Sequence, residues 1–209
     1  MQSPVITTQE PELTHIKAFD STNEVEFKFL ERMYGKFYTD NSESDIRLNI
    51  HFQSRDLNKD LKANEMELVG SIFIGDTKNP TEYTIEKGIV LFSGSHKTTF
   101  LQYHLQTKDF YLHAEKHVNL SSVPNPYKIW KDTSSIFFTI RPRTTHRLPN
   151  LFTSTHNLHG SGRMSIWEPE YPVDQIIGIE TKFRNQHLKL KWLRYLSSTI
   201  ARRYYGLLV

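Results

Sequence analysis

Two histidines and a glutamate within Thr99–Val118 are spaced so that their side chains could meet. The segment has the pattern of a β-hairpin with a two-residue turn at Lys108-Asp109. In that register His104 lies opposite His113, with Cβ atoms about 5 Å apart, and Glu115 follows on the same face. Two imidazoles so placed could share a zinc ion, with the carboxylate as a third ligand. The pattern is more typical of the solvent-facing polar side of a half-buried sheet.

The same register pairs Leu105 with Leu112 on the opposite, apolar face. Gln102 and His117 would join the polar face, but His117 lies about 13 Å along the strand from His113, too far to share a metal ion. The residues that could do chemistry form a polar cluster of His104, His113, Glu115 and Lys116. We predict no metal ion and no cofactor.

Alternating apolar and polar residues continue along much of the chain, as expected for half-buried strands. The predicted strands are Ile46–Phe52, Met66–Ile74, Tyr83–Phe92, Thr99–Thr107, Phe110–Val118, Ser135–Ile140, His156–Trp167 and Gln175–Phe183. Within the second, Gly70 indicates a bulge or a close approach of two backbones. About eight short strands predict an all-β fold, either an antiparallel, lipocalin-like barrel or a sandwich.

Three other segments frame these strands. Residues 186–205 change to helical periodicity, with Leu188, Trp192 and Leu196 on one face, and predict a C-terminal amphipathic helix. Residues 24–38 fit either a helix or a strand, and both interpretations stay open. Residues 1–22 are polar and contain two prolines, which predicts a flexible arm. We therefore expect a single β-rich domain over residues 23–209 after that arm.

Composition limits the classes of protein to consider. The chain has 209 residues, 37% of them hydrophobic and 23% charged, which is typical of a soluble globular protein. It has no cysteine, so disulfides and cysteine-based chemistry are excluded. No apolar run approaches the roughly 18 residues that span a bilayer. With no secretory signal recognisable at the start, we expect a cytoplasmic protein, while export without a cleaved signal stays open.

The net charge of +3 conceals an uneven distribution. Acids prevail in residues 1–45, whereas residues 182–209 contain seven bases and no acid. The two ends could lie against each other, or the basic end could meet an anionic membrane. The residues expected to contact such a membrane are Lys189, Lys191, Arg194, Arg202 and Arg203. We do not expect a nucleic acid partner, and a helix with its bases in water is the simplest alternative.

The stretch Ile129-Trp130-Lys131-Asp132-Thr133-Ser134-Ser135-Ile136-Phe137 resembles an LWxDTTTLF motif. That motif belongs to a module at the C-terminus of some bacterial cholesterol-oxidase-like (glucose–methanol–choline) flavoproteins. Other short stretches agree in order from about residue 30 onward, among them Met33-Tyr34-Gly35, Val69-Gly70-Ser71-Ile72 and Tyr103-His104-Leu105. The resemblance implies a β-rich accessory domain associated with enzymes of sterol or lipid metabolism. The chain has no flavin-binding half, so it does not imply oxidase activity.

The first functional hypothesis is a non-catalytic module that binds a lipid, another hydrophobic ligand or a membrane surface. A barrel can hold one apolar molecule in its mouth. The residues expected to line that site are the aromatic side chains Tyr103, Tyr111, Trp130, Phe137 and Trp192.

Two alternatives belong to other classes. The chain could be an enzyme acting on a lipid or sterol-like substrate, with the polar cluster converging inside the barrel. It could instead be a protein-interaction domain, either an accessory partner of an oxidoreductase or an effector. The sequence leans away from an enzyme because it contains no recognisable catalytic motif.

Overall fold

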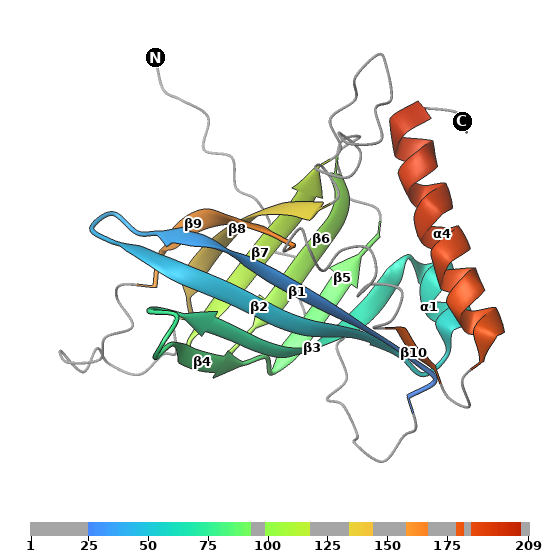
Figure 1. Ribbon diagram of the computed structural model, residues 1–209, viewed down its shortest axis with the longest axis horizontal. Helices are drawn as coiled ribbons and strands as arrows, with labels where there is room; N and C mark the ends of the chain where they lie inside the picture. The colour runs from blue at the N-terminus through green and yellow to red at the C-terminus, as the bar shows by residue number, and fades with distance from the viewer. Residues whose placement is uncertain are drawn as a thin grey trace.

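The computed structural model describes residues 25–92, 99–117, 134–143, 158–166, 179–181 and 185–205, and it is mainly β (Figure 1). The strands are β1 (Phe27–Tyr38), β2 (Glu43–Ser54), β3 (Glu65–Ile74), β4 (Thr81–Thr84), β5 (Lys87–Leu91), β6 (Thr99–Gln106), β7 (Phe110–His117), β8 (Ser135–Pro142), β9 (Gly160–Ser165) and β10 (Ile179–Thr181). The helices are α1 (Leu57–Ala63) and α4 (Gln186–Tyr205). The predicted N-terminal arm, residues 1–22, and Trp130 lie outside the described residues.

Eight strands close into an antiparallel barrel in the order β1-β2-β3-β5-β6-β7-β8-β9, and β9 pairs back onto β1. β4 pairs with β3, and β10 pairs with the first residues of β1, so both extend the sheet outside the ring. The prediction of an all-β fold with a C-terminal helix is confirmed, and the architecture is the barrel rather than the sandwich.

The segment that fitted either helix or strand is a strand. Along β1, Phe27, Phe29, Met33 and Phe37 are all buried. These are alternate positions of the strand, and alternate side chains point to the same face of a sheet. The helical alternative is wrong because a helical stripe would bury Leu30 and Tyr34, which are only half-buried here.

The predicted strand Tyr83–Phe92 is in fact two strands, β4 and β5. Between them the chain changes partners: the Ile85 amide donates to the Gly70 carbonyl, and the Glu86 amide donates to the Gln106 carbonyl. The first bond holds the chain to β3 and the second moves it toward β6, which is why β5 can join the ring where β4 cannot.

Two inward-facing glycines allow neighbouring strands to approach closely. A Cβ at Gly35 of β1 would lie 1.9 Å from the Arg163 carbonyl oxygen of β9. A Cβ at Gly70 of β3 would lie 2.1 Å from the Asn49 carbonyl oxygen, and its φ of +143° also favours glycine. The close approach predicted at Gly70 is therefore confirmed, and Gly35 does the same at the junction that closes the ring.

The sequence did not predict the short helix α1, which joins β2 to β3. Its start is capped by Asp56, whose carboxylate accepts a hydrogen bond from the Lys59 amide at 3.1 Å. Its end is Asn64, in the left-handed region with φ 55°. Leu57 and Leu61 are buried beneath it. Seven residues are too few for helical periodicity to stand out between two long strands.

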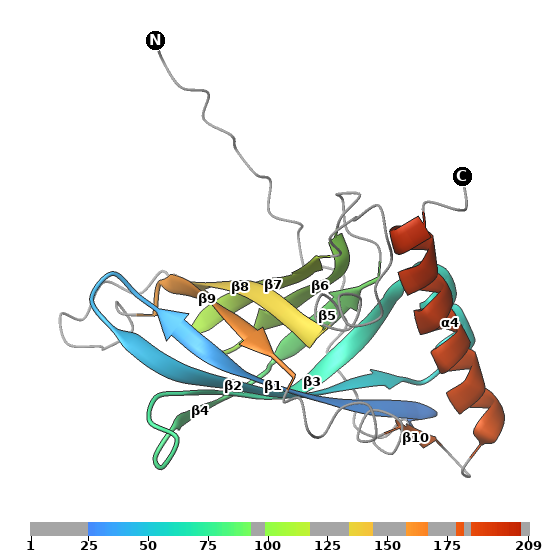
Figure 2. The ribbon, with the colours of Figure 1, turned by 45° about the horizontal axis from the view of Figure 1, so that its top comes forward.

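Helix α4 stands at one end of the barrel (Figure 2), beside α1 (Figure 1). Trp192 attaches it there: the indole lies 5.3 Å from the Phe27 ring, 5.6 Å from Phe92 and 6.2 Å from Phe52, measured between ring centroids. The Tyr195 hydroxyl donates to Asn64 Oδ1 at 2.9 Å. The helix therefore packs its apolar face on the barrel and on the end of α1.

Among the described residues, neither helix combines the length and the apolar character needed to cross a bilayer.

Candidate functional site

The hairpin of β6 and β7 has the predicted register. His104 pairs with His113, Tyr103 with Ala114, and Leu105 with Leu112. The apolar residues face the barrel interior, and the histidines are half-buried on the outer face. This part of the chain could be placed from the sequence because a two-residue turn leaves the pairing little freedom.

The outer polar face forms a chain of contacts centred on Glu115. Its Oε1 accepts from Gln102 Nε2 at 2.8 Å and lies 3.3 Å from His113 Nε2. Its Oε2 lies 3.0 Å from His117 Nε2. His104 Nδ1 and His113 Nδ1 are 3.3 Å apart.

This arrangement does not bring three ligands to one point. The nitrogen of His113 that approaches His104 is Nδ1, whereas the nitrogen that approaches Glu115 is Nε2, on the other side of the ring. Over the described part of the chain, no group of three or more His, Cys, Asp or Glu residues is placed to hold a metal ion.

Burial and neighbouring charge shift two pKa values in this cluster. Desolvation, helped by nearby His113, lowers the pKa of His104 from 6.5 to about 4. Burial alone would raise the pKa of Glu115, but hydrogen bonds from Gln102 and His113 outweigh it, and the pKa is lowered. His104 is therefore a neutral imidazole at physiological pH, and Glu115 is a carboxylate that accepts hydrogen bonds.

Lys116 does not belong with the other three members of the predicted polar cluster. It points into the barrel, where its ammonium group pairs with the carboxylate of Glu31 on β1. The Tyr103 hydroxyl donates to the same carboxylate at 2.8 Å. Glu31 and Lys116 are each only 3% exposed, so the pair lies within the apolar interior. In the ring order β1 lies opposite β6, and the group therefore ties one wall of the barrel to the other.

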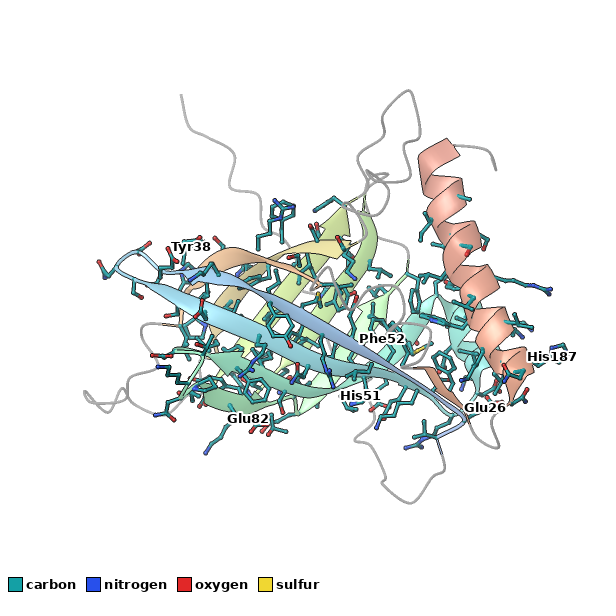
Figure 3. The ribbon with its side chains drawn as sticks, viewed as in Figure 1. Glu26, Tyr38, His51, Phe52, Glu82 and His187 are labelled. Atoms are coloured by element: carbon teal, nitrogen blue, oxygen red, sulfur yellow. The ribbon has the colours of Figure 1, made fainter. Side chains whose placement is uncertain are left out.

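The five residues expected to line a ligand site lie in different places. Tyr103 and Trp192 are buried, and the Phe52 ring contacts both, with its centroid 6.0 Å from that of Tyr103. Figure 3 shows Phe52 on the part of β2 nearest α4. Tyr111 and Phe137 are on the outside, 39% and 52% exposed. Trp130 lies outside the described residues.

The outer surface next to the histidines carries an exposed aromatic side chain. The Phe137 ring lies 6.3 Å from the His117 ring, and the Arg163 guanidinium lies 5.5 Å above it. Phe137 therefore contacts polar and charged neighbours on the outside of β7, β8 and β9 rather than the barrel interior.

A groove lies between the two helices. Its volume is about 470 Å³. Its lining residues are Asn58, Leu61 and Lys62 of α1 and Lys191, Arg194, Tyr195 and Ser198 of α4. Lys191 and Arg194 were predicted to contact an anionic surface, and the structure places them together with Lys62 on one groove. Lys189 is half-buried on the same helix, and the side chains of Arg202 and Arg203 lie outside the described residues.

Sequence reasoning missed Glu31 and the α1 side of the groove. A signal for Glu31 existed, because it occupies the inward row of β1 between Phe29 and Met33. An acid in an apolar row indicates a buried partner. No comparable signal pointed to Lys62, because its position depends on a helix that the sequence does not reveal.

Comparisons with known proteins add no family. No protein-family model matches the chain, and searches of curated proteins and of solved structures find no match either. The resemblance to the flavoprotein-associated module therefore stays a prediction.

Proposed function

We propose that this protein is a non-catalytic module that binds the surface of an anionic membrane through helix α4. The observation that carries the proposal is the composition of that helix. Its 20 residues include no acid, while its described exposed side presents Lys191 and Arg194 beside Leu190, which is 50% exposed. Basic and apolar side chains together are what an interfacial helix uses, because charge attracts it and apolar area inserts.

The barrel interior favours this surface form over a ligand held inside. Large side chains from every part of the ring, including Met33, Leu48, Phe110 and Met164, have no exposed area at all. A void large enough for water would expose the atoms that line it. These side chains therefore border no water-sized void, which supports a surface site over a ligand held among them.

The same geometry favours a binding role over an enzyme. His104, His113 and Glu115 face outward, whereas Lys116 faces inward and is engaged by Glu31. A general acid–base site needs its groups within hydrogen-bonding reach of one reacting molecule. The wall of the barrel separates Lys116 from the three outward-facing residues, which supports a binding role over a site that uses all four.

Vesicle flotation tests the proposal. We expect the protein to float with vesicles of phosphatidylcholine mixed with phosphatidylserine but not with phosphatidylcholine alone, and added salt should release it. Each basic residue near an anionic surface contributes about 1 kcal/mol. The double variant Lys191→Gln/Arg194→Gln should therefore bind roughly 25-fold more weakly, from about 2 kcal/mol lost.

The matched control is Arg32→Gln/Lys78→Gln, which removes two exposed charges from the barrel instead of the helix. It should bind nearly as well as the unmodified protein. If the protein ignores anionic vesicles, or if the two double variants lose binding equally, α4 is not the membrane-binding element and the proposal is wrong.

A further inference from the structure

The groove between α1 and α4 concentrates positive charge around a hollow. Lys62 approaches it from α1, and Lys191 and Arg194 approach it from α4. None of its lining residues is an acid. Among the described residues, none of these three cations makes an ion pair. A concave site lined by one sign of charge focuses the electric field and attracts a counter-ion.

The acids of α1 do not neutralise this charge because they are engaged elsewhere. Asp56 caps the start of the helix by accepting from the Lys59 amide. Asp60 accepts a hydrogen bond from the Ser54 hydroxyl at 2.5 Å, on the side of α1 that faces β2. Both acids are absent from the lining of the groove. Its three cations are therefore available to an anion from outside.

The floor of the groove is partly apolar and held in place. Leu61 is a buried lining residue, and Tyr195 is fixed by the hydrogen bond from its hydroxyl to Asn64 Oδ1. Ser198 and Asn58 add polar side chains to the lining. Cations around an apolar floor suit a ligand that carries both a strong negative charge and a hydrocarbon part.

We propose that this groove binds the phosphomonoester headgroup of a single membrane lipid. The inference rests on the proposed membrane function and names the ligand class of the same helix. A phosphomonoester carries up to two negative charges and three acceptor oxygens, which three cations can satisfy together; Arg194 can engage two of those oxygens at once. A phosphodiester headgroup offers less charge at one point. The volume of about 470 Å³ accommodates a headgroup with the first part of its chains.

The test compares two kinds of vesicle with equal total charge, one containing phosphatidic acid and the other phosphatidylserine. We expect the unmodified protein to prefer phosphatidic acid by about tenfold. Lys62→Gln should abolish that preference while weakening binding to phosphatidylserine only slightly. The matched control is Lys59→Gln, which removes the same charge from the same helix at an exposed position outside the groove, and it should keep the preference.

The outcomes separate the groove from the membrane function. If Lys62→Gln and Lys59→Gln behave alike, or if the unmodified protein has no preference, the groove proposal is overturned while membrane binding through α4 stands. If the protein binds neither kind of vesicle, both proposals fail.

Arg194→Lys keeps the charge but loses the planar fork, and it should reduce the preference as well. Glycerol phosphate in solution serves as a competitor. If its affinity for the protein equals that of the phosphatidic acid vesicles, the ligand is a soluble phosphate and the lipid assignment is wrong. Circular dichroism melting of each variant confirms that the fold is retained.

Discussion

At the scale of single residues, the buried group of Glu31, Lys116 and Tyr103 is where the loss of one charged partner should lower the free energy of unfolding most. Removing one partner of a buried ion pair typically costs about 3–5 kcal/mol, because it leaves a charge unpaired in an apolar interior. We predict that Lys116→Met lowers the free energy of unfolding by that amount, as measured by urea denaturation. The double variant Glu31→Leu/Lys116→Met removes both charges and should recover much of the loss.

The control for this prediction is the exposed ion pair of Lys36 with Glu43 and Asp45, at 3.1 Å and 2.7 Å. Lys36→Met should change stability little, since water screens charges at the surface. If the Lys116→Met variant is as stable as the unmodified protein, the buried Glu31 carboxylate does not need the Lys116 ammonium group as a partner.

His104 makes stability depend on pH. Its pKa is lowered from 6.5 to about 4 in the folded state, chiefly by burial. Between these values the unfolded chain binds a proton that the folded chain does not, so stability falls as pH falls from about 6.5 to about 4. Above pH 6.5 the imidazole is neutral in both states and contributes no pH dependence.

Urea denaturation across that range checks this prediction. We expect His104→Gln to flatten the decline between pH 6.5 and pH 4.5, whereas His187→Gln, on the exposed start of α4, should leave it unchanged. Below about pH 4.5, protonation of Glu115 adds a second decline, because its pKa is also lowered in the fold. An unchanged slope in His104→Gln would mean that His104 is not desolvated.

At the scale of elements, closure of the ring depends on the contact between β1 and β9. A Cβ at Gly35 would meet the Arg163 carbonyl oxygen at 1.9 Å and Met164 Cα at 2.7 Å, both backbone atoms that cannot move without separating the strands. We predict that Gly35→Ala destabilises the protein by about 1–3 kcal/mol, the range for overpacking, or more. Hydrogen exchange should quicken first in β1 and β9.

Ser165→Ala is the matched control, since Ser165 is exposed and directly follows Met164 in β9. It should stay within about 0.5 kcal/mol of the unmodified protein. If Gly35→Ala is equally harmless, the two strands have room that the structure does not show.

Elements also differ in how well the sequence predicts them. The β6–β7 hairpin was predicted to its register, because its turn and its alternation agree. β1 remained undecided because Gly35 and the inward Glu31 interrupt its apolar row. The division of one predicted strand into β4 and β5 depends on hydrogen bonds from Ile85 and Glu86 to residues distant in sequence. Local pattern contains no information about such partners.

At the scale of the whole molecule, Trp192 decides whether helix and barrel behave as one unit. Its ring packs against Phe27 and Phe29 of β1, Phe52 of β2 and Phe92, which follows β5. Truncating a buried tryptophan typically costs about 3–5 kcal/mol. We predict that Trp192→Ala lowers the free energy of unfolding by this amount and exposes α4 to limited proteolysis before the barrel unfolds.

Leu190→Ala is the control on the same helix, because Leu190 is half-exposed and lies away from this cluster. It should leave stability and protease resistance unchanged, although it should weaken insertion into vesicles if α4 binds membranes. Equal proteolysis of the Trp192→Ala variant and the unmodified protein would mean that α4 is held by other contacts.

The sequence by itself determined the class of fold, most of the strands, the pairing of His104 with His113 and the C-terminal helix. These follow from local periodicity and from turn geometry, which act between near neighbours. Only the tertiary structure decided that the sheet closes, that Lys116 meets Glu31 across the interior, and that Lys62 joins Lys191 and Arg194 around a groove. Each of these depends on residues far apart in the chain, and their meeting is set by the curvature and packing of the barrel as a whole.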